Sequence, residues 1–151
     1  MNKIWESIKS LEKLASPLTA FFIGTMFTCA AYGLLSSTLA LRLNAMPITT
    51  AEAGLVLSVY YVGYIFASLS SYRIINRVGH VRAFSVYISV LSALVLLHSI
   101  SPNPLYWGVL RFLEGYCLSS AMMCLESWLN TRTKNQNRGI IMSLYMVTTY
   151  L

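Results

Sequence analysis

Apolar and charged residues alternate along the chain in long blocks. Charge-free runs cover residues 14–41, 53–72 and 83–110. The hydrocarbon core of a bilayer is about 30 Å thick and requires about 20 apolar residues in a helix. The third run is longer than one span and is interrupted by Ser99–Pro104, whose two prolines mark a turn. The pattern therefore predicts membrane-spanning helices at residues 18–42, 53–73, 83–100 and 105–129.

The two ends of the chain differ from these spans. Residues 139–151 are apolar but too few to cross a bilayer, so we expect a truncated fifth span. A natural C-terminus would normally reach the interface with polar residues, and we therefore expect the chain to be a fragment. Residues 1–16 form a cytoplasmic tail that carries apolar and charged positions at helical spacing. This tail is either an amphipathic helix on the inner leaflet or an extension of the first span.

Composition supports an all-α integral membrane protein. Hydrophobic residues make up 56% of the sequence and charged residues 11%, whereas a soluble domain carries roughly 25% charged residues. The three cysteines lie inside predicted spans without histidines at ligand spacing, so we predict no disulfide, metal or cofactor. The sequence contains no nucleophile–base pair that would indicate an enzyme. His80 and His98 have no nearby partners in the sequence and are expected to be ordinary interfacial residues.

Basic residues predict the orientation in the membrane. Nine of the 11 Lys and Arg residues precede the first span, surround the link between spans two and three, or follow span four. The positive-inside rule makes these segments cytoplasmic and places the N-terminus inside. The net charge of +6 therefore suits anionic headgroups of the lipid bilayer, and we predict no nucleic-acid partner.

The fourth span contains charges that are costly in lipid. Glu114 and Glu126 stand about 60° to either side of Arg111 around the helix, on an arc shared with Gly115, Leu118, Met122 and Leu129. A charge at mid-bilayer costs about 2.5–3.5 kcal/mol, so this arc should face the bundle interior or an aqueous cavity. Arg111 and Glu114 either pair structurally at i, i+3 or serve substrate or proton coupling. Glu126, near the cytoplasmic headgroups, is expected to pair with a loop arginine.

Small residues at four-residue steps predict close helix packing. Gly63, Ala67 and Ser71 repeat along the second span, and Gly115 lies in the fourth. Small side chains at this spacing let helix backbones approach in lipid. We therefore expect a packed bundle rather than separate anchors.

Two motifs resemble a known family. The link from Tyr72 to Arg82 resembles the cytoplasmic signature G-x-x-x-D-R-x-G-R-R of the major facilitator superfamily. Arg77 and Gly79 match, Arg82 supplies the last positive charge one position late, Tyr72 replaces the first Gly, and Asn76 replaces the Asp. The Asp helps to lock the bundle through charge pairs in the family, and Asn can only form hydrogen bonds. We predict a signature loop formed by Asn76, Arg77, Gly79 and Arg82.

The second motif, Arg111-Phe-Leu-Glu-Gly115, is similar to the family's R-x-x-Q-G element with Glu in place of Gln. The resemblance implies that Arg111 faces the central cavity, because the family's Arg does so and is tied to proton coupling in antiporters. The segments 77–84 and 126–130 resemble the YcaD-type branch. Family members have twelve spans in two halves, with the substrate cavity between the halves. The chain would then be part of an N-terminal helical bundle, with four complete spans and the start of a fifth.

The function that the resemblance implies is secondary active transport. We expect the N-terminal portion of a carrier that moves a small solute across the inner membrane by alternating access, with proton coupling as one option, and that is inactive as this fragment. The alternatives are a small non-transporting assembly or anchor protein, and an oligomeric channel lined by the charged arc of the fourth span.

Overall fold

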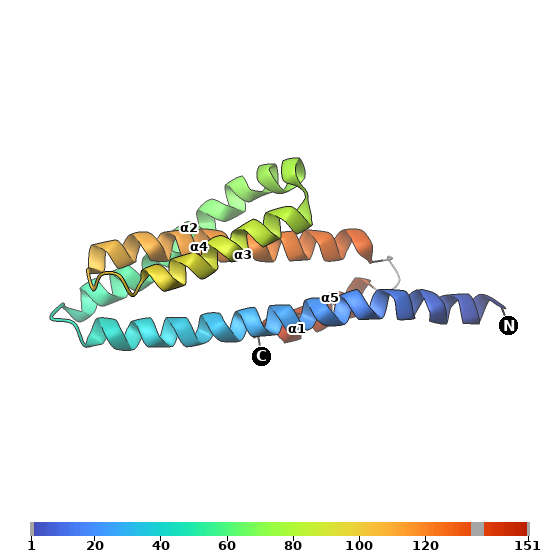
Figure 1. Ribbon diagram of the computed structural model, residues 1–151, viewed down its shortest axis with the longest axis horizontal. Helices are drawn as coiled ribbons and strands as arrows, with labels where there is room; N and C mark the ends of the chain where they lie inside the picture. Colours follow the sequence, from blue (N-terminus) through green and yellow to red (C-terminus); the bar gives the residue numbers. More distant parts are fainter. Residues whose placement is uncertain (1, 134–137, 151) are drawn as a thin grey trace. The chain divides into compact units, whose positions relative to one another are not determined.

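The computed structural model describes residues 2–133 and 138–150 and places all of its regular structure in helices. These helices, drawn in chain order from blue to red in Figure 1, are α1 (Asn2–Asn44), α2 (Thr50–Val78), α3 (His80–Leu97), α4 (Pro104–Arg132) and α5 (Arg138–Tyr150). The chain divides into two units, one formed by residues 1–36 with 134–151 and the other by residues 37–133. The all-α prediction is confirmed.

The first unit combines most of α1 with α5. Helix α1 is continuous from Asn2, so the described part of the predicted tail belongs to the same helix as the first span. The Tyr145 ring of α5 is buried, and its centroid lies 6.5 Å from that of Phe21 on α1. Helix α5 begins one residue before the predicted start of the fifth span, and residue 151 lies outside the described residues.

Helix α2 begins at a reciprocal cap. The Thr49 hydroxyl accepts a hydrogen bond from the Glu52 amide at 3.3 Å, and the Thr49 amide donates to the Glu52 carboxylate at 2.7 Å. These two bonds satisfy amide groups that have no partner within a helix, which explains why the helix starts here.

The link between α2 and α3 is a single residue, and the prediction of a loop at this point is wrong. Helix α2 runs to Val78, α3 begins at His80, and Gly79 joins them with φ = 93°. Residues that have a side chain rarely adopt this backbone conformation, whereas glycine adopts it readily. The chain therefore reverses at Gly79 without any additional loop residues, and the other signature positions lie in helical turns.

The link between α3 and α4 is fixed by side chains of the link itself and of the first turn of α4. Asn103 caps the new helix by accepting a bond from the Leu105 amide at 2.9 Å, and Pro104 occupies the first turn, where no amide is needed. The Trp107 indole donates to the Ser101 carbonyl at 2.7 Å, and the Tyr106 hydroxyl donates to the Leu97 carbonyl at 3.2 Å. These bonds hold the end of α3 against the start of α4.

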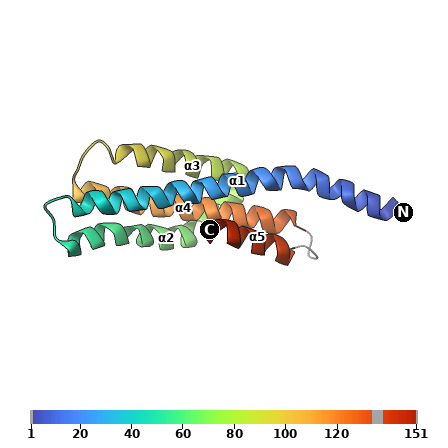
Figure 2. The same cartoon turned by 90° about the horizontal axis from the view of Figure 1, so that it is seen from below.

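Helix α4 is the centre of the second unit. It packs against both α2 and α3, which contact each other much less, and it lies between them in Figure 2. Its buried side chains include Trp107, Leu110, Ala121 and Leu129. The polar residues of α4 are therefore placed in the interior of a three-helix arrangement.

Three of the described helices are long and apolar enough to cross a membrane, namely Phe21–Asn44 within α1, α2 and α3. Helix α4 has 29 residues, which corresponds to about 43 Å, but it carries Arg111, Glu114 and Glu126 and is less apolar. Length permits α4 to span, and its charges are the reason that composition alone does not select it. The fourth span stays a prediction.

Candidate functional site

A cluster of buried ionisable side chains lies where the end of α3 meets the first half of α4. Arg111 and Glu114 are 4% and 0% exposed, and Arg111 Nη1 donates to Glu114 Oε2 at 3.2 Å. The i, i+3 pairing, one of the two alternatives drawn from the sequence, is present in the structure. Burial makes the pair interdependent, because removing either partner would leave an isolated charge away from water.

His98 also belongs to this cluster, contrary to the expectation of an ordinary interfacial residue. It is 5% exposed, and its Nδ1 lies 3.4 Å from Glu114 Oε1. Nδ1 also donates to the Leu94 carbonyl at 3.0 Å. The bonds from Trp107 to Ser101 and from Tyr106 to Leu97 hold the last turn of α3 beside α4, which brings His98 to Glu114.

Aromatic rings surround the cluster. The guanidinium carbon of Arg111 lies 4.9 Å from the ring centroid of Tyr60 on α2, a cation–π contact. The Trp107 ring lies 5.5 Å from that of His98 in an edge-to-face arrangement. We refer to His98, Arg111 and Glu114 as the charged layer. Its members are enclosed by residues from three helices, which explains how charges are accommodated inside an apolar bundle.

Helices α2 and α4 pack backbone to backbone at two glycines, and we refer to this contact as the crossing. A Cβ atom at Gly63 would overlap the carbonyl oxygen of Phe112, and a Cβ atom at Gly115 would overlap that of Tyr60. Ala67 and Ser71 continue the same face of α2 and are fully buried. The predicted packing residues thus lie at the α2–α4 contact, and Gly115 immediately follows the charged layer.

A second polar layer lies beyond this crossing, towards the end of α2. The hydroxyls of Ser71 and Ser120 are hydrogen-bonded to each other, and Ser120 also donates to the Tyr116 carbonyl at 2.7 Å. Ser70 donates to the Tyr116 hydroxyl at 3.1 Å. We refer to Ser70, Ser71, Tyr116 and Ser120 as the hydroxyl layer. It connects α2 to α4 without a formal charge.

The predicted signature residues lie at the end of the second unit where α2 turns into α3. Asn76 and Arg77, in the last turn of α2, and Arg82, in the first turn of α3, are exposed. His80, which was expected to be an ordinary interfacial residue, connects this turn to α4, because its Nε2 lies 2.8 Å from the Ser127 hydroxyl. Glu126 is half-buried beside Ser127, and its pairing with an arginine stays a prediction.

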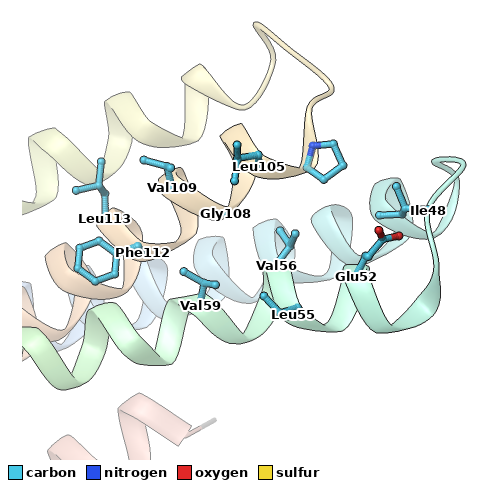
Figure 3. Close-up of a pocket in the computed structure, with 11 residues that line it drawn as sticks. Ile48, Glu52, Leu55, Val56, Val59, Leu105, Gly108, Val109, Phe112 and Leu113 are labelled. Atoms are coloured by element: carbon cyan, nitrogen blue, oxygen red, sulfur yellow. The ribbon is translucent and has the colours of Figure 1, made fainter.

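An apolar groove of about 710 Å³ opens between the first halves of α2 and α4. Figure 3 shows its lining, which includes Leu55, Val59, Val109 and Phe112. The carboxylate in the lining, Glu52, is already bonded to Thr49 in the helix cap. The groove offers mainly hydrophobic surface, and the polar chemistry of this unit lies in the two layers instead.

The described residues contain no group of three or more His, Cys, Asp or Glu side chains that would hold a metal ion. The charged layer combines one carboxylate, one guanidinium and one imidazole. Such a set can bind and release a proton or hold a charged group, because the carboxylate has two neighbours that carry or can acquire positive charge.

Comparison with known proteins identifies the family. The sequence profile of the Major Facilitator Superfamily matches residues 21–151. The chain is 23% identical to an uncharacterized MFS-type transporter of Enterobacter sp. (strain 638), with 93% of this chain and 37% of the relative aligned. It is also 23% identical to the uncharacterized MFS-type transporters YcaD of Salmonella arizonae and Salmonella newport, with 89% of this chain and 35% of each relative aligned. No solved structure matches the chain significantly.

The chain therefore belongs to the major facilitator superfamily, a family of membrane transporters. It spans little more than a third of the length of the curated relatives that it matches. The family prediction made from the two motifs is confirmed, and relatives named YcaD are among the matches, as the segments 77–84 and 126–130 indicated. The five helices correspond to part of an N-terminal bundle of this family.

Proposed function

We propose that these residues form the first part of a secondary active transporter that moves a small solute across the cytoplasmic membrane by alternating access. The observation that carries this proposal is the buried charged layer in a chain of a transporter family. Ionisable residues inside a membrane bundle raise the free energy of insertion, and they mark substrate or ion pathways. Arg111 and Glu114 are the residues that we propose for coupling or substrate binding.

The proposed orientation has the N-terminus and the α2–α3 turn in the cytoplasm. Arg73, Arg77, Arg82 and Arg132 lie at the end of the second unit that contains this turn, and each is exposed. Arg42 is at the opposite end, in the last turn of α1. This distribution supports the assignment under the positive-inside rule.

Single cysteines test the orientation. The native Cys29, Cys117 and Cys124 are first replaced by serine, and Asn76→Cys or Ile100→Cys is then introduced, since both positions are exposed. In sealed right-side-out vesicles we expect a membrane-impermeant maleimide to label Ile100→Cys and to spare Asn76→Cys. Inside-out vesicles should give the reverse, and the opposite pattern in both preparations would contradict the proposed orientation.

Transport by this fold requires a cavity between two helical halves. We therefore propose that residues 1–151 alone do not transport, and that activity requires segments corresponding to the rest of the relatives. No bond-making chemistry is required of the chain, since a carrier binds its solute on one side and releases it on the other.

The transport test compares two proteins in proteoliposomes loaded with the pH-sensitive dye pyranine. One is the 151-residue chain, and the other is its fusion to the remaining two thirds of the Salmonella relative. A panel of sugars, amino acids, organic acids and organic cations is added outside. We expect a solute-dependent dye response from the fusion and none from the chain alone. A comparable response from the chain alone would contradict the proposal, and a solute-independent proton leak would favour an oligomeric channel.

A further inference from the structure

Glu114 lies between two groups that can carry positive charge. Its Oε2 is 3.2 Å from Arg111 Nη1, and its Oε1 is 3.4 Å from His98 Nδ1. All three side chains are at most 5% exposed. Charges at such distances interact far more strongly when they are shielded from water. The protonation state of His98 therefore determines how the Glu114 carboxylate is shared between the two neighbours.

The backbone determines which nitrogen of the neutral His98 ring carries hydrogen. Nδ1 is 3.0 Å from the Leu94 carbonyl oxygen, which can only accept, so Nδ1 is the donor. Nε2 then carries the lone pair and has no hydrogen-bond partner among residues 2–133 and 138–150 that the structure describes. An added proton would bind at Nε2, while the N–H at Nδ1 already lies beside Glu114.

The charged groups around His98 have opposite effects on its protonation. Glu114 attracts an imidazolium, whereas Arg111, in the same cluster on α4, repels it. Trp107 packs against the ring with centroids 5.5 Å apart. Tyr60, from α2, contacts Arg111 through its ring face and can hold the guanidinium when the carboxylate moves away. This balance allows a proton to bind and to leave.

We propose that His98 is a proton-binding residue and that its protonation draws the Glu114 carboxylate from Arg111 towards His98. The only bond that forms is N–H at Nε2, and hydronium supplies the proton and is left as water. The new ion pair joins the end of α3 to α4, while the Arg111–Glu114 pair weakens. The use of this proton in coupled transport rests on the proposed function, whereas the proton site itself does not.

Histidine NMR on the 151-residue chain in lipid bilayers measures the tautomer and the protonation of His98 directly. The sequence has two histidines, so His80→Gln leaves the ring signal of His98 alone. At neutral pH we expect the Nδ1–H tautomer, and on acidification a single titration. Glu114→Gln in this background should lower the His98 midpoint by at least about one pH unit, because it removes the attracting carboxylate.

The matched control is Glu126→Gln, which removes the same charge about 18 Å further along α4 and should leave the midpoint unchanged. An unchanged midpoint in Glu114→Gln, an equal shift in Glu126→Gln, or an Nε2–H tautomer at neutral pH would overturn the proposal. Transport by the fusion protein is assayed separately, so a transport failure leaves this result intact.

A second measurement does not depend on the folding of Glu114→Gln. In the His80→Gln chain, labelled at histidine nitrogen and glutamate carboxyl carbon, the dipolar coupling between His98 Nδ1 and the Glu114 carboxyl carbon reports their distance. We expect a coupling at neutral pH that becomes stronger below the midpoint. A coupling that is absent at both pH values, or that weakens on acidification, would overturn the proposal.

Discussion

Helix α4 carries two polar layers that differ in kind, separated by the crossing at Gly63 and Gly115, and the first of them joins α4 to the end of α3. The charged layer contains a carboxylate, a guanidinium and an imidazole, each at most 5% exposed. The hydroxyl layer joins α4 to α2 through Ser71 and Ser120 with neutral groups. Ser71 and Ser120 are as fully buried as the charged layer, so burial alone does not distinguish the two layers.

The difference between the layers lies in what each costs and what each can do. An interhelical hydrogen bond contributes on average about 0.6 kcal/mol in a membrane bundle, and a charge at the bilayer centre costs about 2.5–3.5 kcal/mol. The hydroxyl layer shows that α2 and α4 can be connected without charges. We therefore propose that the charged layer, where α4 meets the end of α3, serves the movement of ions or solutes rather than packing alone.

The largest expected effect is in the charged layer. Glu114→Ala should lower the free energy of unfolding by about 3–5 kcal/mol, because Arg111 is left buried with its charge uncompensated. The measurement is unfolding by sodium dodecyl sulfate in mixed micelles. The double variant Arg111→Met/Glu114→Met should regain most of the loss, since neither charge remains. Equal losses in the single and double variants would contradict the account of a coupled pair.

The crossing between the layers should respond almost as strongly. In Gly115→Ala the added methyl would overlap the Tyr60 carbonyl oxygen, and we expect a loss of about 3 kcal/mol in the same unfolding assay. Gly108→Ala is a matched control on the same helix, because nothing lies within 4 Å of its Cβ position. It should be neutral or stabilising by up to about 1 kcal/mol. Similar losses in both variants would show that the glycine contact is not what joins the helices.

The smallest effect is expected in the hydroxyl layer. Ser120→Ala removes the bond to Ser71 and should cost about 0.6 kcal/mol of unfolding free energy. Ser89→Ala, which removes a bond within an exposed part of α3, is the comparison for a serine outside the interface. A loss at Ser120 as large as that at Glu114 would remove the distinction between the two layers.

Much of the fold follows from local patterns in the sequence. Apolar runs and the proline-containing turn placed the helices, and the four-residue repeat of small residues placed the face of α2 that contacts α4. The positions of Arg111 and Glu114 on one side of α4 followed from helical geometry. Each of these features depends on residues within one helix or one turn.

The features that the sequence did not reveal depend on the register between helices. His98 meets Glu114 because Trp107 and Tyr106 hold the last turn of α3 beside α4, and Tyr60 meets Arg111 because Gly115 allows close approach. Neither register is encoded in the periodicity of a single segment. The loop predicted from the signature motif is wrong for a related reason, since one glycine with positive φ reverses the chain between two helices.

The central claim is that the charged layer serves transport and the hydroxyl layer serves packing. The most direct measurement is the solute-dependent pyranine response of the fusion protein carrying either Glu114→Gln or Ser120→Ala, with equal amounts of inserted protein in the membrane. We predict that Glu114→Gln abolishes the response and that Ser120→Ala retains it. Equal responses from the two variants would contradict the claim.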